Sequence, residues 1–436
     1  MSERMRRDDV IAITTAFVSS PRFVTALTTV SVGTAVFAFT LRQLIGPAGL
    51  IAIIAGLVVL AGASAFARRE SIQWRGLLPI SLLAFLGWAG LSVLWSAYKW
   101  ATLGGLAFLG AFTVLALYVA LMRDTIQIVR AYGDVLRFVL GVSIALEIIS
   151  GVLVDTPIKL LDISGNLDVL GPIQGISGTR NQLGILAVIA LITFLTELRT
   201  RSVPRGLAIG SIVGAGIALL LTRSPVAIGA LIVVALAAVA LYGLRRVAPE
   251  RRRFWQVGLL VAVVIAAGLA WAFRSVIVSV LNAGGELSYR LEVWRQTWAL
   301  IGLNPLEGWG WIGDWREDIP PFVLFAPIGS RPTTSAVNAF VDVWFQVGLV
   351  GLAIFVGLVG LALVRSWLLA SRRRSFVFTW PALVLVALIT TALAESSLIV
   401  EFGWLTFVVC AVKAAEQLSW RQAFERLDEP EPATDS

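Results

Sequence analysis

The chain has 436 residues, of which 58% are hydrophobic and 14% are charged, and its formal net charge is +8. Soluble domains contain about 25% charged residues, so this composition excludes an ordinary water-soluble enzyme. The chain has no histidine and one cysteine, Cys410. This excludes a Ser-His-Asp triad, zinc or haem held by histidine, cysteine-based clusters and an internal disulfide. Its chemistry must therefore use arginine, carboxylates, amides or hydroxyls.

Twelve apolar runs approach the length of about 20 residues that a helix needs to cross a bilayer. They cover residues 23–41, 46–67, 76–97, 101–122, 134–154, 181–197, 206–222, 225–244, 256–274, 338–364, 376–397 and 399–415. The sequence therefore predicts an all-α, polytopic integral membrane protein with about twelve transmembrane helices. Residues 23–415 would form a single membrane domain.

The basic residues indicate how these spans are oriented. Of the 35 Lys and Arg residues, 24 fall in the pieces that are cytoplasmic if the N-terminus is inside, and ten fall in the outer pieces. This bias follows the positive-inside rule. It predicts a multi-pass protein of the plasma (inner) membrane, with residues 1–22 and the polar tail 416–436 both cytoplasmic. Because the arginines cluster between apolar runs, we expect no nucleic-acid partner.

Two predicted outer segments are too long to be simple connectors. The first covers residues 155–180, and the second is a large extracytoplasmic loop over residues 275–337, between the ninth and tenth spans. In the second, Ser288 is positioned to cap a helix that runs through YRLEVWRQTWALI and ends before Gly302. Arg290, Trp294 and Trp298 are four residues apart on that helix, so they should form one stripe.

Three arginines of the outer pieces are candidate anion ligands. Arg223 lies in the tight turn LLLTRSPVA, Arg180 lies in GTRNQLG beside Asn181, and Arg290 lies on the loop helix. Guanidinium groups make paired hydrogen bonds that match a diphosphate well. Interfacial anchoring and snorkelling explain the same positions equally well.

Carboxylates close to the membrane form a second set of candidates. Asp342 lies near the outer start of the tenth span, and Glu395 and Glu401 flank the outer turn of the last hairpin. Asn338 and Asp342 are four residues apart and would share a helix face. Such groups usually mark a site or a pathway. The alternative is a structural partner for an arginine, which we prefer for Glu147.

Four stretches, in this order, resemble the O-antigen ligase and O-antigen polymerase-like superfamily of bacterial polysaccharide polymerases and ligases. They are GTRNQLGILA (178–187), LTRSPVAIGAL (221–231), SYRLEVWRQTWALIGLNPLEGWGW (288–311) and SAVNAFVDVWFQVGLVGLAIF (335–355). The closing ALAESSLIVEFGW (392–404) is similar to the polymerase branch. The first five spans match only in their hydropathy.

The resemblance implies a membrane glycosyltransferase that polymerises or ligates undecaprenyl-diphosphate-linked glycan repeat units on the outer membrane face, for surface polysaccharide biosynthesis. A metal or other cofactor is not expected. The implied partners are the lipid-linked glycan donor, a glycan acceptor and membrane lipid. Association with other polysaccharide-assembly proteins is also consistent with it.

By family position, the resemblance assigns diphosphate binding to Arg223, Arg290 and Arg180. Asn181, Asn338 and Trp294 would line the cavity that holds the glycan.

This chain departs from the family pattern at one position. Relatives usually read His-Asn at the start of the tenth span, where this chain has Val337 and Asn338. Either a carboxylate replaces the histidine, with Asp342 the first choice and Glu395 the second, or stabilisation of the leaving group suffices. The departure favours a polymerase over a ligase. The alternatives are a lipid-linked oligosaccharide flippase or other polytopic transporter, and a non-catalytic homologue that binds glycan lipid.

Overall fold

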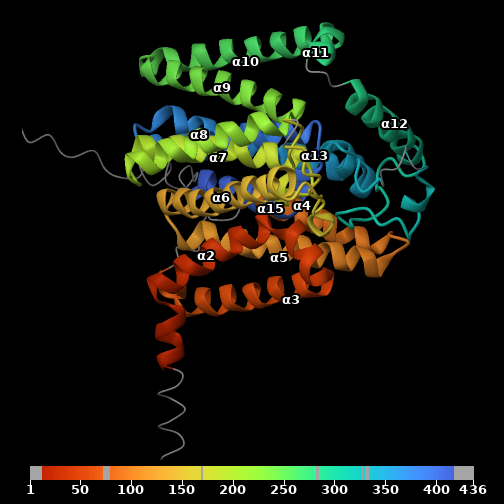
Figure 1. The fold of residues 1–436 in the computed structure, drawn as a ribbon, viewed down its shortest axis with the longest axis horizontal. Coiled ribbons are helices and arrows are strands. Elements are labelled where there is room, and N and C mark those ends of the chain that lie inside the picture. Colours follow the sequence, from red (N-terminus) through yellow and green to blue (C-terminus); the bar gives the residue numbers. More distant parts are fainter. Residues whose placement is uncertain are drawn as a thin grey trace, which may run out of the picture.

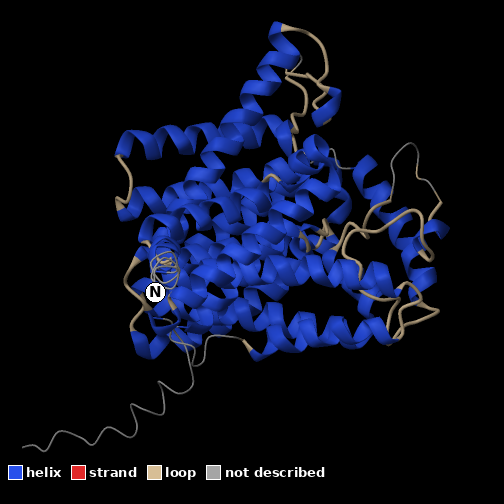
Figure 2. Cartoon of the chain, turned by 90° about the horizontal axis from the view of Figure 1, so that it is seen from below, coloured by secondary structure: helices blue, strands red, loops and turns tan. Residues whose placement is uncertain are grey.

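The computed structural model describes residues 12–71, 79–167, 170–280, 284–326, 328 and 333–416. Within these ranges the chain is mainly helical, and Ile158 and Ile163 form an isolated β-bridge (Figure 2). The α-helices are α2 (Pro21–Val36), α3 (Ala38–Ala67), α4 (Ile80–Leu91), α5 (Lys99–Met122), α6 (Thr125–Ile148), α7 (Arg180–Thr200), α8 (Arg205–Thr222), α9 (Pro225–Arg246), α10 (Pro249–Ala272), α11 (Arg274–Val280), α12 (Gly284–Ile301), α13 (Ala339–Arg372), α14 (Thr379–Ala392) and α15 (Glu401–Glu416). The predicted all-α class is confirmed.

Each of the twelve predicted apolar runs overlaps at least one of these helices. Within the described residues, seven helices are long and apolar enough to cross a membrane: Ala38–Ala67, Lys99–Met122, Thr125–Leu153, Arg180–Thr200, Arg205–Thr222, Pro225–Arg246 and Ala339–Arg372. The shorter apolar helices Ile80–Leu94 and Phe376–Ala392 pack among them. The protein is therefore a multi-pass membrane protein.

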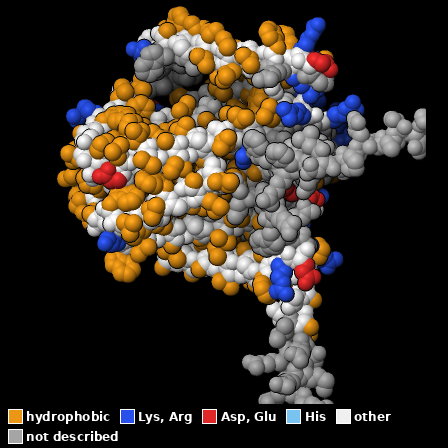
Figure 3. Space-filling model, turned by 180° about the vertical axis from the view of Figure 1, so that it is seen from behind, with side chains coloured by type: hydrophobic (Ala, Val, Ile, Leu, Met, Phe, Trp, Pro, Cys, Tyr) orange, Lys and Arg blue, Asp and Glu red, His pale blue; other side chains and the backbone are white. Residues whose placement is uncertain are grey.

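Helix α7 forms the centre of the bundle, and the outer helices present apolar side chains to their surroundings. Packing against α6, α8, α9 and α14 buries 72% of the apolar segment of α7. By contrast, Val59 on α3, Leu220 on α8 and Val239 on α9 are each about 70% exposed. Apolar side chains cover most of the described surface in Figure 3. An apolar exterior of this kind suits a lipid environment.

The segment between α10 and α13 lies at one end of the bundle, on the right in Figure 1. It follows the course of the predicted large loop and contains α11 and α12. Helix α13 is interrupted at Val347 and Gly348, where Gly348 has a φ of +72°. The loop backbone fills the interruption: Trp309 N donates to Phe345 O, and Leu349 N donates to Pro305 O. This pairing satisfies backbone groups that would otherwise be exposed to an apolar environment.

The predicted start of the loop helix is wrong. Helix α12 begins at Gly284 rather than after Ser288, and Ser288 Oγ donates to the Gly284 carbonyl within the helix. The earlier start places Glu286 in the first turn, where an acidic side chain is favoured by the helix dipole. Glu286 also forms an i,i+4 pair with Arg290. The predicted end before Gly302 is confirmed.

Glu147 explains how part of the first long loop is fixed. Its buried carboxylate accepts hydrogen bonds from the backbone N–H groups of Gln174 and Gly175, at 3.0 and 2.9 Å. The residue is structural, as expected, but its partner is backbone rather than an arginine. The contact holds the segment that leads into α7.

Candidate functional site

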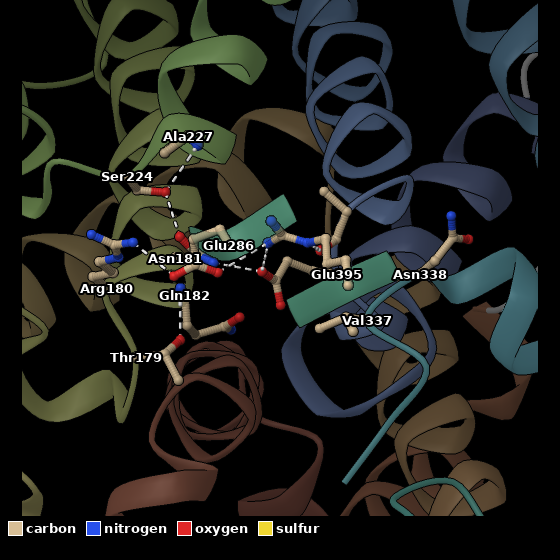
Figure 4. Close-up of polar contacts among 12 residues, drawn as sticks. Thr179, Arg180, Asn181, Gln182, Ser224, Ala227, Glu286, Val337, Asn338 and Glu395 are labelled. Atoms are coloured by element: carbon tan, nitrogen blue, oxygen red, sulfur yellow. Dashed lines mark hydrogen bonds and ion pairs between the residues drawn. The ribbon is translucent and has the colours of Figure 1, made fainter. Parts of the chain in front are cut away.

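The N-termini of α7 and α9 meet through a side-chain hydrogen bond. Thr179 caps α7 and Ser224 caps α9, each accepting a backbone N–H from its own helix. Ser224 Oγ also donates to Asn181 Oδ1 at 2.7 Å, and both residues are buried. This contact fixes Asn181 so that its amide nitrogen points away from α9 and toward Glu395 (Figure 4).

Arg290 extends from α12 to the turn between α14 and α15. Its Nε donates to the carbonyl of Ala394, and its Nη2 donates to Glu395 Oε1, both at 3.0 Å. Only 8% of the residue is exposed. Because a buried guanidinium needs compensating charge and hydrogen bonds, these two contacts account for its stability there.

The two oxygens of Glu395 have different surroundings. Oε1 accepts from Asn181 Nδ2 at 2.6 Å and from Arg290 Nη2 at 3.0 Å. Oε2 forms no hydrogen bond within the described chain, and 20% of the side chain is exposed. One carboxylate oxygen is therefore held in place while the other is open to accept a proton or a hydrogen bond.

Glu286 connects two of the predicted arginines. Its carboxylate pairs with Arg180 Nη2 at 2.7 Å and lies 3.7 Å from Arg290 Nη2. Sequence reasoning missed Glu286, although its four-residue spacing from Arg290 was a visible signal. We call Arg180, Asn181, Glu286, Arg290 and Glu395 the arginine network (Figure 4).

Arg223 borders the arginine network but is not part of it. It lies between α8 and the Ser224 cap of α9, in the predicted tight turn, with a left-handed φ of +46°. The residue is exposed, and its side chain forms no hydrogen bond or ion pair with any described residue. Its guanidinium group is therefore available to a ligand.

Asp342 lies in a separate cluster. Its Oδ1 accepts from Trp315 Nε1 at 2.8 Å and from Gln346 Nε2 at 2.7 Å, and its Oδ2 accepts from Ala336 N at 3.2 Å. The residue is 1% exposed. Trp315 also packs on Phe345. We call this cluster, centred on Asp342, Gln346, Trp315 and Phe345, the loop core.

Val337 and Asn338 join the two clusters. Asn338 caps α13 by accepting the backbone N–H groups of Phe340 and Val341, and its Nδ2 donates to Leu393 O at 3.0 Å. Figure 4 shows Val337 beside Glu395, with the Asn338 side chain directed away from the arginine network. The expectation that Asn338 and Asp342 share a helix face is wrong, because Asn338 precedes the helix in an extended conformation.

The predicted stripe on α12 faces the segment around the start of α13. Trp294 Nε1 donates to the Ala336 carbonyl at 2.9 Å. Trp298 packs edge-on against Trp344, with ring centroids 5.1 Å apart. Together with Arg290, these side chains dock α12 onto the rest of the site.

Another side of α12 carries an exposed ion pair between Arg295 and Glu292. Arg295 donates to both carboxylate oxygens of Glu292, and Gln296 donates to one of them. These hydrogen bonds lower the pKa of Glu292 to about 2. The Arg295 side chain is 72% exposed. The helix therefore offers a matched comparison between a buried and an exposed arginine.

The arginine network offers guanidinium donors and one open carboxylate oxygen. Among the described residues, there is no group of three His, Cys, Asp or Glu side chains that could hold a metal ion. The groups at hand suit recognition of an anion and acceptance of a proton.

Comparison with known proteins identifies one domain in the chain. Residues 210–356 match the family model described as O-Antigen ligase. This region includes Arg223, Arg290, Trp294 and Asp342, whereas Glu395 lies beyond it. No curated protein matches the chain. The resemblance predicted from the sequence is confirmed: the chain is a helical membrane protein that carries the domain of the O-antigen ligase family over residues 210–356.

Proposed function

We propose that the protein is a membrane glycosyltransferase that polymerises, or ligates, glycan repeat units carried on undecaprenyl diphosphate. Family membership implies a role in polysaccharide assembly. The observation that carries the specific activity is the pairing of Arg290 with a carboxylate, Glu395, that keeps one oxygen open. A diphosphate leaving group and an attacking hydroxyl need these two kinds of group side by side.

In the proposed reaction, a hydroxyl of the acceptor sugar attacks the anomeric carbon of the donor. The hydroxyl proton passes to Glu395 Oε2, the new C–O bond forms, and the bond to the diphosphate oxygen breaks. Arg290 and Arg180 bind the diphosphate and stabilise the charge that develops on it. Arg223 supplies a third guanidinium from the neighbouring turn. Asn181 holds the Glu395 carboxylate in position.

Of the two carboxylates predicted to replace the family histidine, the contacts favour Glu395. The two oxygens of Asp342 accept three hydrogen bonds between them inside the loop core, so a proton transfer there would break structural contacts. Asn338 and Trp294 would then act by shaping the cavity wall that the glycan contacts.

The proposal also includes the finer membrane topology. Twelve spans with both termini cytoplasmic would place residues 155–180 and 275–337 on the outer face. The arginine network would lie at that face, where a lipid-linked glycan can approach it with its carrier still in the bilayer. Transfer would proceed without a metal ion.

Reconstitution tests the activity. The purified protein in lipid vesicles is given lipid-linked repeat units in the presence of a chelator, and the products are separated by gel electrophoresis. A ladder of longer lipid-linked glycans is expected. Transfer to a second, non-carrier acceptor would identify a ligase instead. Movement of unchanged units across the bilayer, or binding without transfer, would contradict the proposal and support a flippase or a non-catalytic homologue.

A substitution of Arg223 tests whether this residue binds the diphosphate or only anchors the protein at the membrane surface. If Arg223 contacts the diphosphate, we expect Arg223→Ala to reduce chain extension about tenfold or more, with the protein still inserted at normal levels. Arg295→Ala is the control, because Arg295 is an exposed arginine that lies outside the arginine network. Equal activity of the two variants would contradict the role of Arg223.

A further inference from the structure

A cavity of about 290 Å³ lies between α3, α5 and the start of α15. Its polar part is formed by Arg42, Asp314 and Glu401, and its aromatic part includes Trp100 and Trp311. Neither the arginine network nor the loop core contributes to its lining. The proposed function therefore leaves this cavity without a role.

The wall formed by the loop is held firmly in place. Ile312 N and Gly313 N both donate to Gln346 Oε1, at 2.8 and 2.9 Å, and Trp311 N donates to Ser92 Oγ at 3.0 Å. The Ile312 backbone packs directly on Gly105 of α5, where a Cβ atom would clash with it. The cavity is therefore preformed, as ligand sites usually are.

The charges in the cavity do not suit a diphosphate. Arg42 Nη2 pairs with Glu401 at 2.5 Å, and Arg42 Nη1 lies 3.4 Å from Asp314. Arg316, the other lining arginine, is bound by both oxygens of Asp318. Both cations are thus neutralised by carboxylates, in contrast to the unpaired Arg223. An anionic group would meet the carboxylates without a free cation to bind it.

The same groups suit a neutral saccharide. Asp314 and Glu401 each retain one carboxylate oxygen with no hydrogen bond in the described chain, and sugar hydroxyls can donate to these oxygens. The Asp314 side chain is 49% exposed, so its open oxygen is accessible. Trp100 is 87% exposed at the edge of the cavity. An exposed indole offers a flat apolar face on which a sugar ring can stack.

We propose that this cavity is a saccharide subsite that binds an uncharged sugar unit of the acceptor glycan. The inference rests on the proposed function, since it gives that reaction a second substrate site. One sugar unit of the acceptor would be held in this cavity, and the donor diphosphate would be held at the arginine network. The two sites differ in their cations: the unpaired Arg223 borders the arginine network, whereas both arginines of the cavity are paired with carboxylates. The cavity also has aromatic faces.

Gly104 allows the cavity to be filled without disturbing the fold. It lines the cavity, and a Cβ atom there would meet no atom within 4 Å. Gly110 lies on the same helix with the same free space, but outside the cavity lining. Gly104→Leu should therefore block the subsite, and Gly110→Leu is the matched control. Trp100→Ala removes the stacking surface without filling the cavity.

The test measures binding of two probes to the full-length protein in lipid nanodiscs. The first probe is the neutral oligosaccharide released by mild acid from the lipid-linked pool of producing cells. The second is a short-chain polyprenyl diphosphate. We expect Gly104→Leu and Trp100→Ala to weaken oligosaccharide binding at least tenfold, with diphosphate binding unchanged. Arg290→Ala should show the opposite pattern, and Gly110→Leu should bind both probes normally.

Two results would overturn the subsite. The first is oligosaccharide binding that is equal in Gly104→Leu and Gly110→Leu. The second is a copurifying phospholipid, detected by native mass spectrometry, that Gly104→Leu displaces, because the cavity would then be a lipid site. Failure of the proposed function is distinguishable, since it would appear as absent diphosphate binding in the unaltered protein.

Discussion

The arginine network and the loop core lie at the same end of the bundle, and each is built around one carboxylate. In the loop core, both oxygens of Asp342 accept hydrogen bonds, which come from Trp315, Gln346 and the backbone of Ala336. In the arginine network, Glu395 is anchored through one oxygen only. Burial and charge therefore do not distinguish the two carboxylates. Under the proposed function, the unused hydrogen-bonding capacity of Glu395 makes it the candidate base.

The residues around the two carboxylates also differ: those around Asp342 are mainly aromatic, and those around Glu395 are mainly charged. The loop core is aromatic and holds a long segment onto α13, as a protein core does. The arginine network consists of four charged side chains and the amide of Asn181, from three separate parts of the chain, and its two arginines share Glu286. Charges brought together in this way are costly to bury unless they serve a ligand or each other. The network therefore suits binding, and the loop core suits structural support.

The largest expected effect is that of removing Arg290. We expect Arg290→Ala to reduce chain extension by about 10³-fold, because it deletes a leaving-group contact and leaves Glu395 without its buried cation. The measurement is the initial rate of product formation with vesicles that contain equal amounts of protein. Arg295→Ala, on the exposed side of the same helix, should leave the rate within about twofold. Similar losses in both variants would show that α12 acts only through its charge.

The next largest effect is expected from neutralising Glu395. Glu395→Gln keeps the size of the side chain and an oxygen that can accept from Arg290 and Asn181, but it cannot take up a proton. We expect the rate to fall about 10²-fold, which is typical for loss of a general base, with little change in diphosphate binding. An unchanged rate would mean that stabilisation of the leaving group alone suffices.

A substitution in the loop core should lower the stability of the protein and leave the reaction rate nearly unchanged. Asp342→Asn places an amide N–H₂ against groups that already donate, so we expect the free energy of unfolding to fall by about 2 kcal/mol. The rate per folded molecule should stay close to that of the unaltered protein. Thermal unfolding in detergent gives the first quantity, and the vesicle assay gives the second. A folded Asp342→Asn protein without activity would reverse the comparison and make Asp342 the base.

Much of the fold and part of the arginine network follow from local sequence. Apolar runs predicted where the helices lie, and the Arg-Ser-Pro turn predicted the sharp connection of α8 to α9. The interruption of α13 was missed because Val347 and Gly348 sit within a continuous apolar run. Its cause is the distant backbone of residues 305–310, which local pattern cannot reveal.

The arrangement of the carboxylates could not be predicted for the same reason. Sequence spacing ranked Asp342 ahead of Glu395, because it lies close to the position of the family histidine. Only the tertiary structure shows that both oxygens of Asp342 already accept hydrogen bonds. Glu286 was overlooked because the helix was expected to begin after Ser288, beyond Glu286. Distance along the chain is thus a poor guide to which charges meet.

The smallest expected effect concerns Val337, which joins the two regions. Its φ of +46° lies in the left-handed region, which a β-branched residue rarely adopts and which costs about 1–3 kcal/mol. Asparagine tolerates this conformation, so we expect Val337→Asn to raise the free energy of unfolding by about 1 kcal/mol after the loss of some apolar contact. Val337→Ile keeps the β-branch and should give no gain. If both variants are equally stable, the backbone at this joint stores no strain, and the boundary between the arginine network and the loop core is set by Asn338 and its contact with Leu393 alone.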